Sequence, residues 1–283
     1  MPKKNEIFIS FMDDLPENKN ISNSGFNITK ENNKNDDDDE EDIKDILKIK
    51  KFDVEAQKIP INNMMKQNII PSHPFRALAS GGSGSGKTML ILNLLKRKNF
   101  FKNYFDIIFL FSPTVGKDQT QQLLNIPESN IQSDLDKKGV DHLKHIFDVQ
   151  QREIEKNGIG KSDKILIIFD DIISSEKFLN SATYKKVLIQ GRHSNISSIT
   201  LTQKFHAIPR TLRLQMTDIF FFPSSNSEVE RLVDEFTPPG KSKKDFAKLV
   251  DVATKKQYNF LYINMKSPPD KRYRRNLDTY LRI

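Results

Sequence analysis

The residues best suited to chemistry form one glycine-rich segment, Gly81-Gly82-Ser83-Gly84-Ser85-Gly86-Lys87-Thr88. Its spacing is G-x-x-x-x-G-K-[ST], the pattern of a phosphate-binding P-loop. Glycines let the backbone approach a phosphate closely, so that successive N–H groups can surround one anion. Lys87 is then placed to reach the β- and γ-phosphates, and the Thr88 hydroxyl to bind Mg²⁺. We expect the whole segment to bind ATP; the alternative is a flexible Gly/Ser-rich loop that matches by chance.

Two adjacent carboxylates, Asp170 and Asp171, follow the apolar run Ile165-Leu166-Ile167-Ile168-Phe169. In P-loop enzymes the first acid after such a strand holds Mg²⁺, which makes Asp170 the expected Walker B residue. Neighbouring side chains at a strand end point in different directions, so Asp171 can serve separately to orient and deprotonate a water molecule. The alternative for Asp171 is that it only caps the next helix.

A polar side chain at the end of the strand that follows the acid pair can sense the γ-phosphate. Gln203 has this place at the end of Ile196–Gln203, and Thr202 is a substitute. The alternative is an ordinary polar residue at a strand end. We expect Gln203 to belong to the catalytic set.

Arginines offer a further contact to phosphate. Arg192, in Gly191-Arg192-His193-Ser194-Asn195, can act in its own site or as an arginine finger in a neighbouring subunit. Arg210 and Arg213 are the other candidates for a finger. A surface arginine paired with an acid is the commoner alternative. His193 has no metal-ligand partner at a suitable spacing, so we interpret it as structural.

The elements that must position these residues alternate between strands and helices, which predicts an α/β fold of the P-loop NTPase (ASCE) type. Its central sheet is expected to be mostly parallel and flanked by helices, with ligand at the carboxyl ends of the strands. The expected strands cover residues 75–79, 105–111, 164–169, 196–203, 218–222 and 258–263. The expected helices cover residues 89–97, 141–156 and 176–190, and two more start at the capping boxes Ser225–Glu228 and Ser242–Asp245 and end near Phe236 and Thr254.

Charge and composition divide the chain of 283 residues into three parts. Residues 1–57 are expected to be a disordered acidic, Asn-rich leader, 58–265 the P-loop ATPase domain, and 266–283 an irregular basic tail. Residues 1–60 hold 15 Asp/Glu and 10 Lys/Arg, whereas the rest of the chain holds 22 and 35. A basic body favours a polyanionic partner slightly over a merely soluble lysine-rich surface. The acidic leader could mask that body, and deletion of residues 1–57 without any change in DNA affinity would exclude this.

The absence of cysteine excludes disulfides and is consistent with a reducing compartment. No apolar run reaches the roughly 18 residues of a membrane helix, and the N-terminus lacks the apolar core of a secretory signal. We therefore expect an intracellular protein without a membrane span that is not secreted.

Several segments together resemble one family, the genome-packaging ATPases of large double-stranded DNA viruses and virophages. These poxvirus-type proteins belong to the FtsK/HerA superfamily of P-loop NTPases. The resemblance covers residues 71–265. It depends on His73-Pro74-Phe75-Arg76 before the P-loop, Asp170-Asp171, Gly191-Arg192-His193 with Asn195-Ile196, Thr202-Gln203, and Ile208-Pro209 with Arg213. One departure is Gly81-Gly82, where Gly-Pro-Thr or Gly-Pro-Ser is expected; it should alter loop stiffness but not phosphate capture.

The resemblance implies an ATP-driven translocase of double-stranded DNA that packages a viral genome into the capsid. Subunits would form a ring with ATP at each interface, and capsid vertex or portal proteins are possible partners. The location implied is the host cytoplasm or viral factory, with the virion as a further possibility. By the family pattern, Lys87 and Thr88 bind nucleotide and Mg²⁺, Asp170 binds the metal, Asp171 the water, and Gln203 is the sensor.

Two other functions stay open for a P-loop chain of this kind. A nucleoside or polynucleotide kinase needs several arginines over the phosphates, and Arg192, Arg210 and Arg213 leave that open. A nonenzymatic, nucleotide-gated DNA-binding component of the virion would bind ATP without turnover. Phosphate-acceptor screens and turnover with and without DNA separate these functions, whereas accompanying helicase motifs are not seen.

Overall fold

The structure is a computed structural model that describes residues 68–114 and 123–282. The acidic leader expected over residues 1–57 lies outside the described residues. Within the described part, no helix is both long and apolar enough to cross a membrane.

The described residues build a nine-stranded sheet in the order β3-β2-β4-β5-β1-β6-β7-β8-β9. Its first six strands run parallel to their neighbours, and β7, β8 and β9 are added antiparallel. The fold is therefore the expected α/β arrangement with a mostly parallel sheet. The strands are β1 (Arg76–Ser80), β2 (Ile107–Phe111), β3 (Ile131–Gln132), β4 (Ile165–Asp170), β5 (Ile196–Thr202), β6 (Asp218–Phe221), β7 (Leu261–Asn264), β8 (Tyr273–Arg275) and β9 (Thr279–Leu281).

Alternate side chains of each central strand enter different hydrophobic clusters, because successive residues of a strand point to opposite faces. In β4, Ile165, Ile167 and Phe169 pack on one face, whereas Leu166 and Ile168 pack on the other. All five are buried, which is the reason for the continuous apolar run in the sequence.

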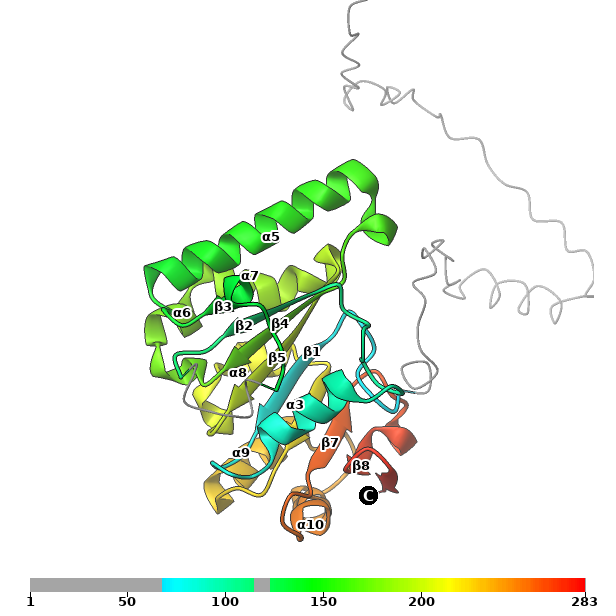
Figure 1. Cartoon of the computed structure of the whole chain (residues 1–283). Helices are drawn as coiled ribbons and strands as arrows, with labels where there is room; N and C mark the ends of the chain where they lie inside the picture. Colours follow the sequence, from blue (N-terminus) through cyan, green and yellow to red (C-terminus); the bar gives the residue numbers. More distant parts are fainter. Residues whose placement is uncertain (1–67, 115–122, 283) are drawn as a thin grey trace, which may run out of the picture. The chain divides into compact units, whose positions relative to one another are not determined.

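Helices cover both faces of the sheet unequally. Helix α3 packs on one face and lies in front of the sheet in Figure 1, while the other helices pack on the opposite face. The helices are α3 (Lys87–Lys96), α5 (Lys137–Asn157), α6 (Glu176–Asn180), α7 (Ala182–Gln190), α8 (Arg210–Arg213), α9 (Asn226–Phe236) and α10 (Lys243–Thr254).

The helix expected over residues 176–190 is two helices, α6 and α7. Ser181 separates them: its hydroxyl accepts a hydrogen bond from the backbone N–H of Tyr184 and caps α7. Serine is favoured at such a cap because its oxygen satisfies one of the first backbone donors of a helix. The two-residue strand β3 was not expected within the polar insertion.

The expectation of an irregular segment from Lys266 onward is wrong, because this segment supplies β8 and β9. Arg274 lies at the centre of β8 and is 1 % exposed. Its guanidinium lies 5.6 Å from the ring centroid of Tyr262 and 4.6 Å from that of Tyr280, and it donates to the backbone oxygen of Asn68 at 2.7 Å. Aromatic faces attract a cation, which lets this arginine occupy a buried strand position.

Candidate nucleotide-binding site

The carboxyl ends of the central strands meet at one edge of the sheet, beside a cavity of about 1230 Å³. Ser80 at the end of β1 pairs with Thr202 of β5 and Phe221 of β6, and Asp170 at the end of β4 pairs with Leu201. Because β5 lies between β1 and β4, the P-loop, the acid pair and Thr202-Gln203 are brought to the same edge. Residues from all three segments line the cavity.

The P-loop requires glycine at specific positions. Gly84 and Gly86 have φ angles of 71° and 104°, which L side chains rarely adopt, and Gly86 is the N-cap of α3. A Cβ atom at Gly81 would lie 2.5 Å from Cβ of Phe222, closer than two such atoms can approach. The glycines therefore permit the turn that directs the N-terminus of α3 at the cavity, an arrangement that attracts phosphate.

Lys87 is the first residue of α3, and its ammonium lies over the loop. Nζ donates to the backbone oxygens of Gly81 and Gly82, at 2.6 and 2.8 Å. Burial lowers the pKa of this lysine, and the carboxylates of Asp170 and Asp171 oppose that shift. The cation is thus held between the loop and the acid pair.

Thr88 and Asp170 both line the cavity, the first from α3 and the second from β4. A hydroxyl and a carboxylate are oxygen ligands, which suit Mg²⁺. The donor set therefore fits the metal expected from the sequence.

Asp171 lies in the left-handed region, at φ 51° and ψ 32°, and precedes a short 3₁₀ turn at Ile172–Ser174. Its carboxylate makes no capping hydrogen bond to that turn, contrary to the alternative of a helix cap. Asp171 instead lines the cavity, as Asp170 does. Backbone conformations of this kind are concentrated at functional sites.

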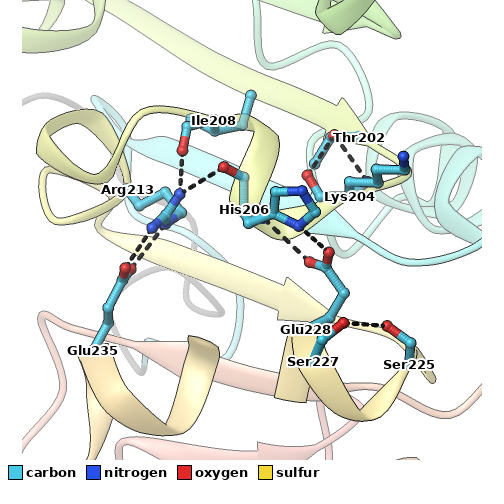
Figure 2. Close-up of polar contacts among 9 residues, drawn as sticks. All are labelled: Thr202, Lys204, His206, Ile208, Arg213, Ser225, Ser227, Glu228 and Glu235. Atoms are coloured by element: carbon cyan, nitrogen blue, oxygen red, sulfur yellow. Dashed lines mark hydrogen bonds and ion pairs between the residues drawn. The ribbon is translucent and has the colours of Figure 1, made fainter. Parts of the chain in front are cut away.

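Thr202 and Gln203 differ in what their side chains do at the end of β5. The Thr202 hydroxyl accepts from the backbone N–H of Lys204 at 3.2 Å and donates to its backbone oxygen at 3.0 Å (Figure 2). Gln203 is exposed and lines the cavity. Of the two sensor candidates, Gln203 therefore has the side chain available for a ligand.

The chain that follows Gln203 is attached to α9 by two glutamates, shown in Figure 2. Glu228 accepts from the backbone N–H of His206 at 3.1 Å and also contacts Nδ1 of that histidine. The capping box read from Ser225–Glu228 is therefore wrong. Ser225 is the N-cap residue of α9 but makes no capping bond, and its hydroxyl contacts Ser227. Glu228 bonds to the long-range partner His206 instead.

Arg213 forms the second attachment and is 4 % exposed. Its guanidinium donates to both carboxylate oxygens of Glu235 and to the backbone oxygens of His206 and Ile208 (Figure 2). These contacts occupy Arg213 within its own chain and argue against its use as a finger. Arg210 is exposed and lies 3.8 Å from the same glutamate.

Arg192 lies at the opposite end of β5 from the P-loop. It belongs to a 3₁₀ turn at Gly191–Ser194 that precedes β5, and a strand of that length spans about 20 Å. Arg192 is exposed, and its Nε donates to Nε2 of His193 at 3.0 Å. It does not line the cavity of its own chain. That Arg192 acts as an arginine finger in a neighbouring subunit stays a prediction.

A buried polar network closes this amino end of the sheet. Nδ1 of His73 lies 2.6 Å from the Ser197 hydroxyl, and its Nε2 lies 2.8 Å from Oδ1 of Asn195. The Asn195 amide donates to the backbone oxygens of Ser162 and Asp163, both at 3.1 Å. Burial lowers the pKa of His73 to about 4. The motif residues around Arg192 are thus partly structural.

Sequence reasoning missed the far wall of the cavity, which comes from the C-terminal strands and the approach to β7. The sequence did contain one signal that the cavity extends in this direction. Met89, Asn93 and Arg97 are spaced by four residues, which places them on one side of the helix, and all three line the cavity. The residues of this wall that line the cavity are Tyr258, Phe260, Asn276, Leu277, Asp278 and Tyr280.

Comparison with known proteins places the chain in a family. Residues 62–268 match the family described as Poxvirus A32 protein. The chain is 29 % identical over 199 residues to the DNA packaging protein OPG160 of Variola virus, covering 70 % of this chain and 71 % of that protein. It is 30 % identical over 190 residues to OPG160 of Vaccinia virus (strain Copenhagen), covering 67 % and 68 %.

A solved structure supports the fold. The genome packaging NTPase B204 of Sulfolobus turreted icosahedral virus 2, in complex with AMP, matches with a TM-score of 0.51 and 16 % identity. The match covers 71 % of this chain and 96 % of that one. The extent of the family match, together with the P-loop and acid pair at one edge of the sheet, shows that this chain belongs to the poxvirus A32 protein family.

Proposed function

We propose that this protein is an ATPase that drives double-stranded DNA into a viral capsid. The observation that carries the proposal is the convergence of Lys87, Asp170, Asp171 and Gln203 on one cavity in a member of this family. The names of the relatives, DNA packaging proteins, support the type of substrate. Its place of action is then the viral factory or the virion.

Each side chain has a separate task in hydrolysis. The P-loop N–H groups and Lys87 bind the β- and γ-phosphates, and Thr88 and Asp170 hold Mg²⁺. When bound, Mg²⁺ would neutralise charge that develops on the phosphates. Asp171 accepts the proton of the attacking water, and Gln203 contacts the γ-phosphate and reports its loss to the chain after β5.

Assembly into a ring would complete the site. Arg192 is exposed at the amino end of β5, away from its own cavity, which suits a contact across a subunit interface. DNA is then gripped mainly through its phosphates, because a motor must bind any sequence. The excess of 35 Lys/Arg over 22 Asp/Glu after residue 60 supports such contacts.

Hydrolysis of ATP with and without duplex DNA tests the proposal. We expect Mg²⁺-dependent turnover that DNA stimulates and that falls as salt rises, because phosphate contacts release counterions. Lys87→Ala should abolish turnover. Native turnover in Lys87→Ala would overturn the catalytic assignment, whereas native turnover without any response to DNA would overturn the motor and leave a nucleotide site.

A matched assay covers the other functions. Phosphate transferred to a nucleoside or DNA end, in place of inorganic phosphate, would indicate a kinase. Binding of ATP without turnover, in the presence of DNA, would indicate a nucleotide-gated virion component. The attachment of Arg213 to Glu235 leaves one arginine fewer for the phosphate-covering lid that kinases use.

A further inference from the structure

The cavity extends past the phosphate-binding residues as a groove with two walls. One wall is the outer side of α3, where Met89, Asn93 and Arg97 face the groove at four-residue spacing. The other wall is the C-terminal hairpin, through residues 276–278 and Tyr280. From Lys87 to Arg97 a helix rises about 15 Å, enough to accommodate a nucleoside beyond its phosphates.

Tyr258 lies directly beside the P-loop. A Cβ atom at Gly86 would lie 3.4 Å from Cδ1 of Tyr258 and 3.6 Å from Cε1 of Phe222, so both rings border the loop. Tyr258 is 58 % exposed and has a φ of 66°, which a bulky residue rarely adopts. An exposed aromatic ring is thus held in an unfavourable backbone conformation at the cavity.

Tyr280 is the second exposed ring of the groove, at 44 %. Its position is fixed from behind by Arg274, whose guanidinium lies 4.6 Å from the ring centroid and is itself buried. The cation–π contact holds Tyr280, while the exposed part of the ring can contact a ligand. A ring held in this way is a preorganised platform, which lowers the entropic cost of binding a flat ligand.

We propose that this groove binds the purine base and ribose of the nucleotide, with Tyr258 and Tyr280 as its aromatic contacts. The inference rests on the nucleotide binding in the proposed function and not on movement of DNA. Aromatic side chains stack on bases, and a purine buries more ring surface than a pyrimidine. Asp278, in the turn between β8 and β9, supplies a carboxylate that accepts hydrogen bonds from ribose hydroxyls.

Calorimetric titration with MgATP, MgCTP and inorganic tripolyphosphate tests the proposal. Tripolyphosphate reports the P-loop alone, since it has neither base nor ribose. We expect Tyr258→Ala and Tyr280→Ala each to weaken MgATP about tenfold, to reduce the preference over MgCTP, and to leave tripolyphosphate unchanged. Tyr258→Phe keeps the ring and should retain native affinity.

Three results would overturn the proposal: unchanged MgATP affinity in both alanine variants, no purine preference in the native protein, or an equal loss for MgATP and tripolyphosphate. The last would show that the tyrosines act by shaping the P-loop. Leu214→Ala is the matched control, because Leu214 is 45 % exposed and does not line the cavity. If neither MgATP nor tripolyphosphate binds the native protein, the proposed function itself is refuted.

Discussion

The two ends of the central strands use polar residues in opposite ways. At the carboxyl end, Lys87, Asp170, Asp171 and Gln203 line an open cavity. At the amino end, the side chains of His73, Ser197 and Asn195 form hydrogen bonds with one another and are buried. Both ends carry motif residues, so a motif alone does not distinguish a ligand site from a structural network. What distinguishes them is whether the polar side chains line a cavity or are enclosed in the fold.

The cations at the amino end follow the same rule. Arg76 donates to the backbone oxygens of Leu188 and Ile189, near the C-terminus of α7. Lys266 donates to the backbone oxygens of Ser72 and Pro74 at 2.8 and 3.0 Å. Burial lowers the pKa of both, and neighbouring cations lower it further. Arg192 is the exception in this group, because its side chain extends at the surface.

Arg192→Ala should give the largest effect and tests whether the amino end acts on a neighbouring subunit. An arginine finger is worth about 10³–10⁵ in turnover, so we expect a loss of that order with native nucleotide affinity. Mixing Arg192→Ala with inactive Lys87→Ala should restore part of the activity. One subunit then supplies the lysine and its neighbour the arginine. Full activity of Arg192→Ala alone would make the amino end purely structural.

Asp171→Asn should give the next largest effect, at the carboxyl end. The amide keeps the size of the side chain but cannot accept a proton, so turnover should fall by about 10²–10⁴. Nucleotide affinity should hold, because Lys87 and Thr88 are unchanged. Single-turnover hydrolysis and nucleotide titration separate the two quantities. If Asp171→Asn keeps native turnover, Asp171 has only a structural role at the end of β4.

The carboxyl end could be predicted from the sequence because its signals are local. The spacing of the P-loop glycines and the apolar run before Asp170 each report the conformation of their own segment. Strands β2, β4 and β6 could be predicted for the same reason, since buried parallel strands are continuous apolar runs.

The C-terminal hairpin could not be predicted because its stability depends on distant partners. Charged residues at 272, 274 and 275 conceal the alternation of β8, and Arg274 is buried only through Tyr262, Tyr280 and the backbone of Asn68. A distant partner also explains why the capping box at Glu228 was predicted wrongly. Glu228 bonds to His206 and not to the start of its own helix. The part of the cavity wall that the hairpin supplies was therefore hidden from the sequence.

Acid should lower the free energy of unfolding through His73, at the amino end of the sheet. Its pKa is about 4 in the folded protein and about 6.5 when unfolded, so between these values only the unfolded state binds the proton. Stability is full above pH 6.5 and is lost as the pH falls toward 4, by roughly 3 kcal/mol at 1.36 kcal/mol per pH unit. Urea unfolding at several pH values measures this loss. His73→Phe should remove that part of the slope, and an unchanged slope would assign it to other groups.

Glu228→Gln should give the smallest effect and tests whether α9 supports the carboxyl end from outside. The amide keeps an acceptor for the N–H of His206 but loses the charge, and bonds to charged groups contribute about 1.5–3 kcal/mol. We expect a loss of about 1 kcal/mol in unfolding free energy, because one neutral bond remains. Turnover should fall a few-fold, since the chain after Gln203 is held less firmly. Glu230→Gln, exposed on the same helix, is the matched control and should change neither quantity. Equal stability and equal turnover of the two variants would mean that the carboxyl end of the sheet positions Gln203 without contacts from α9.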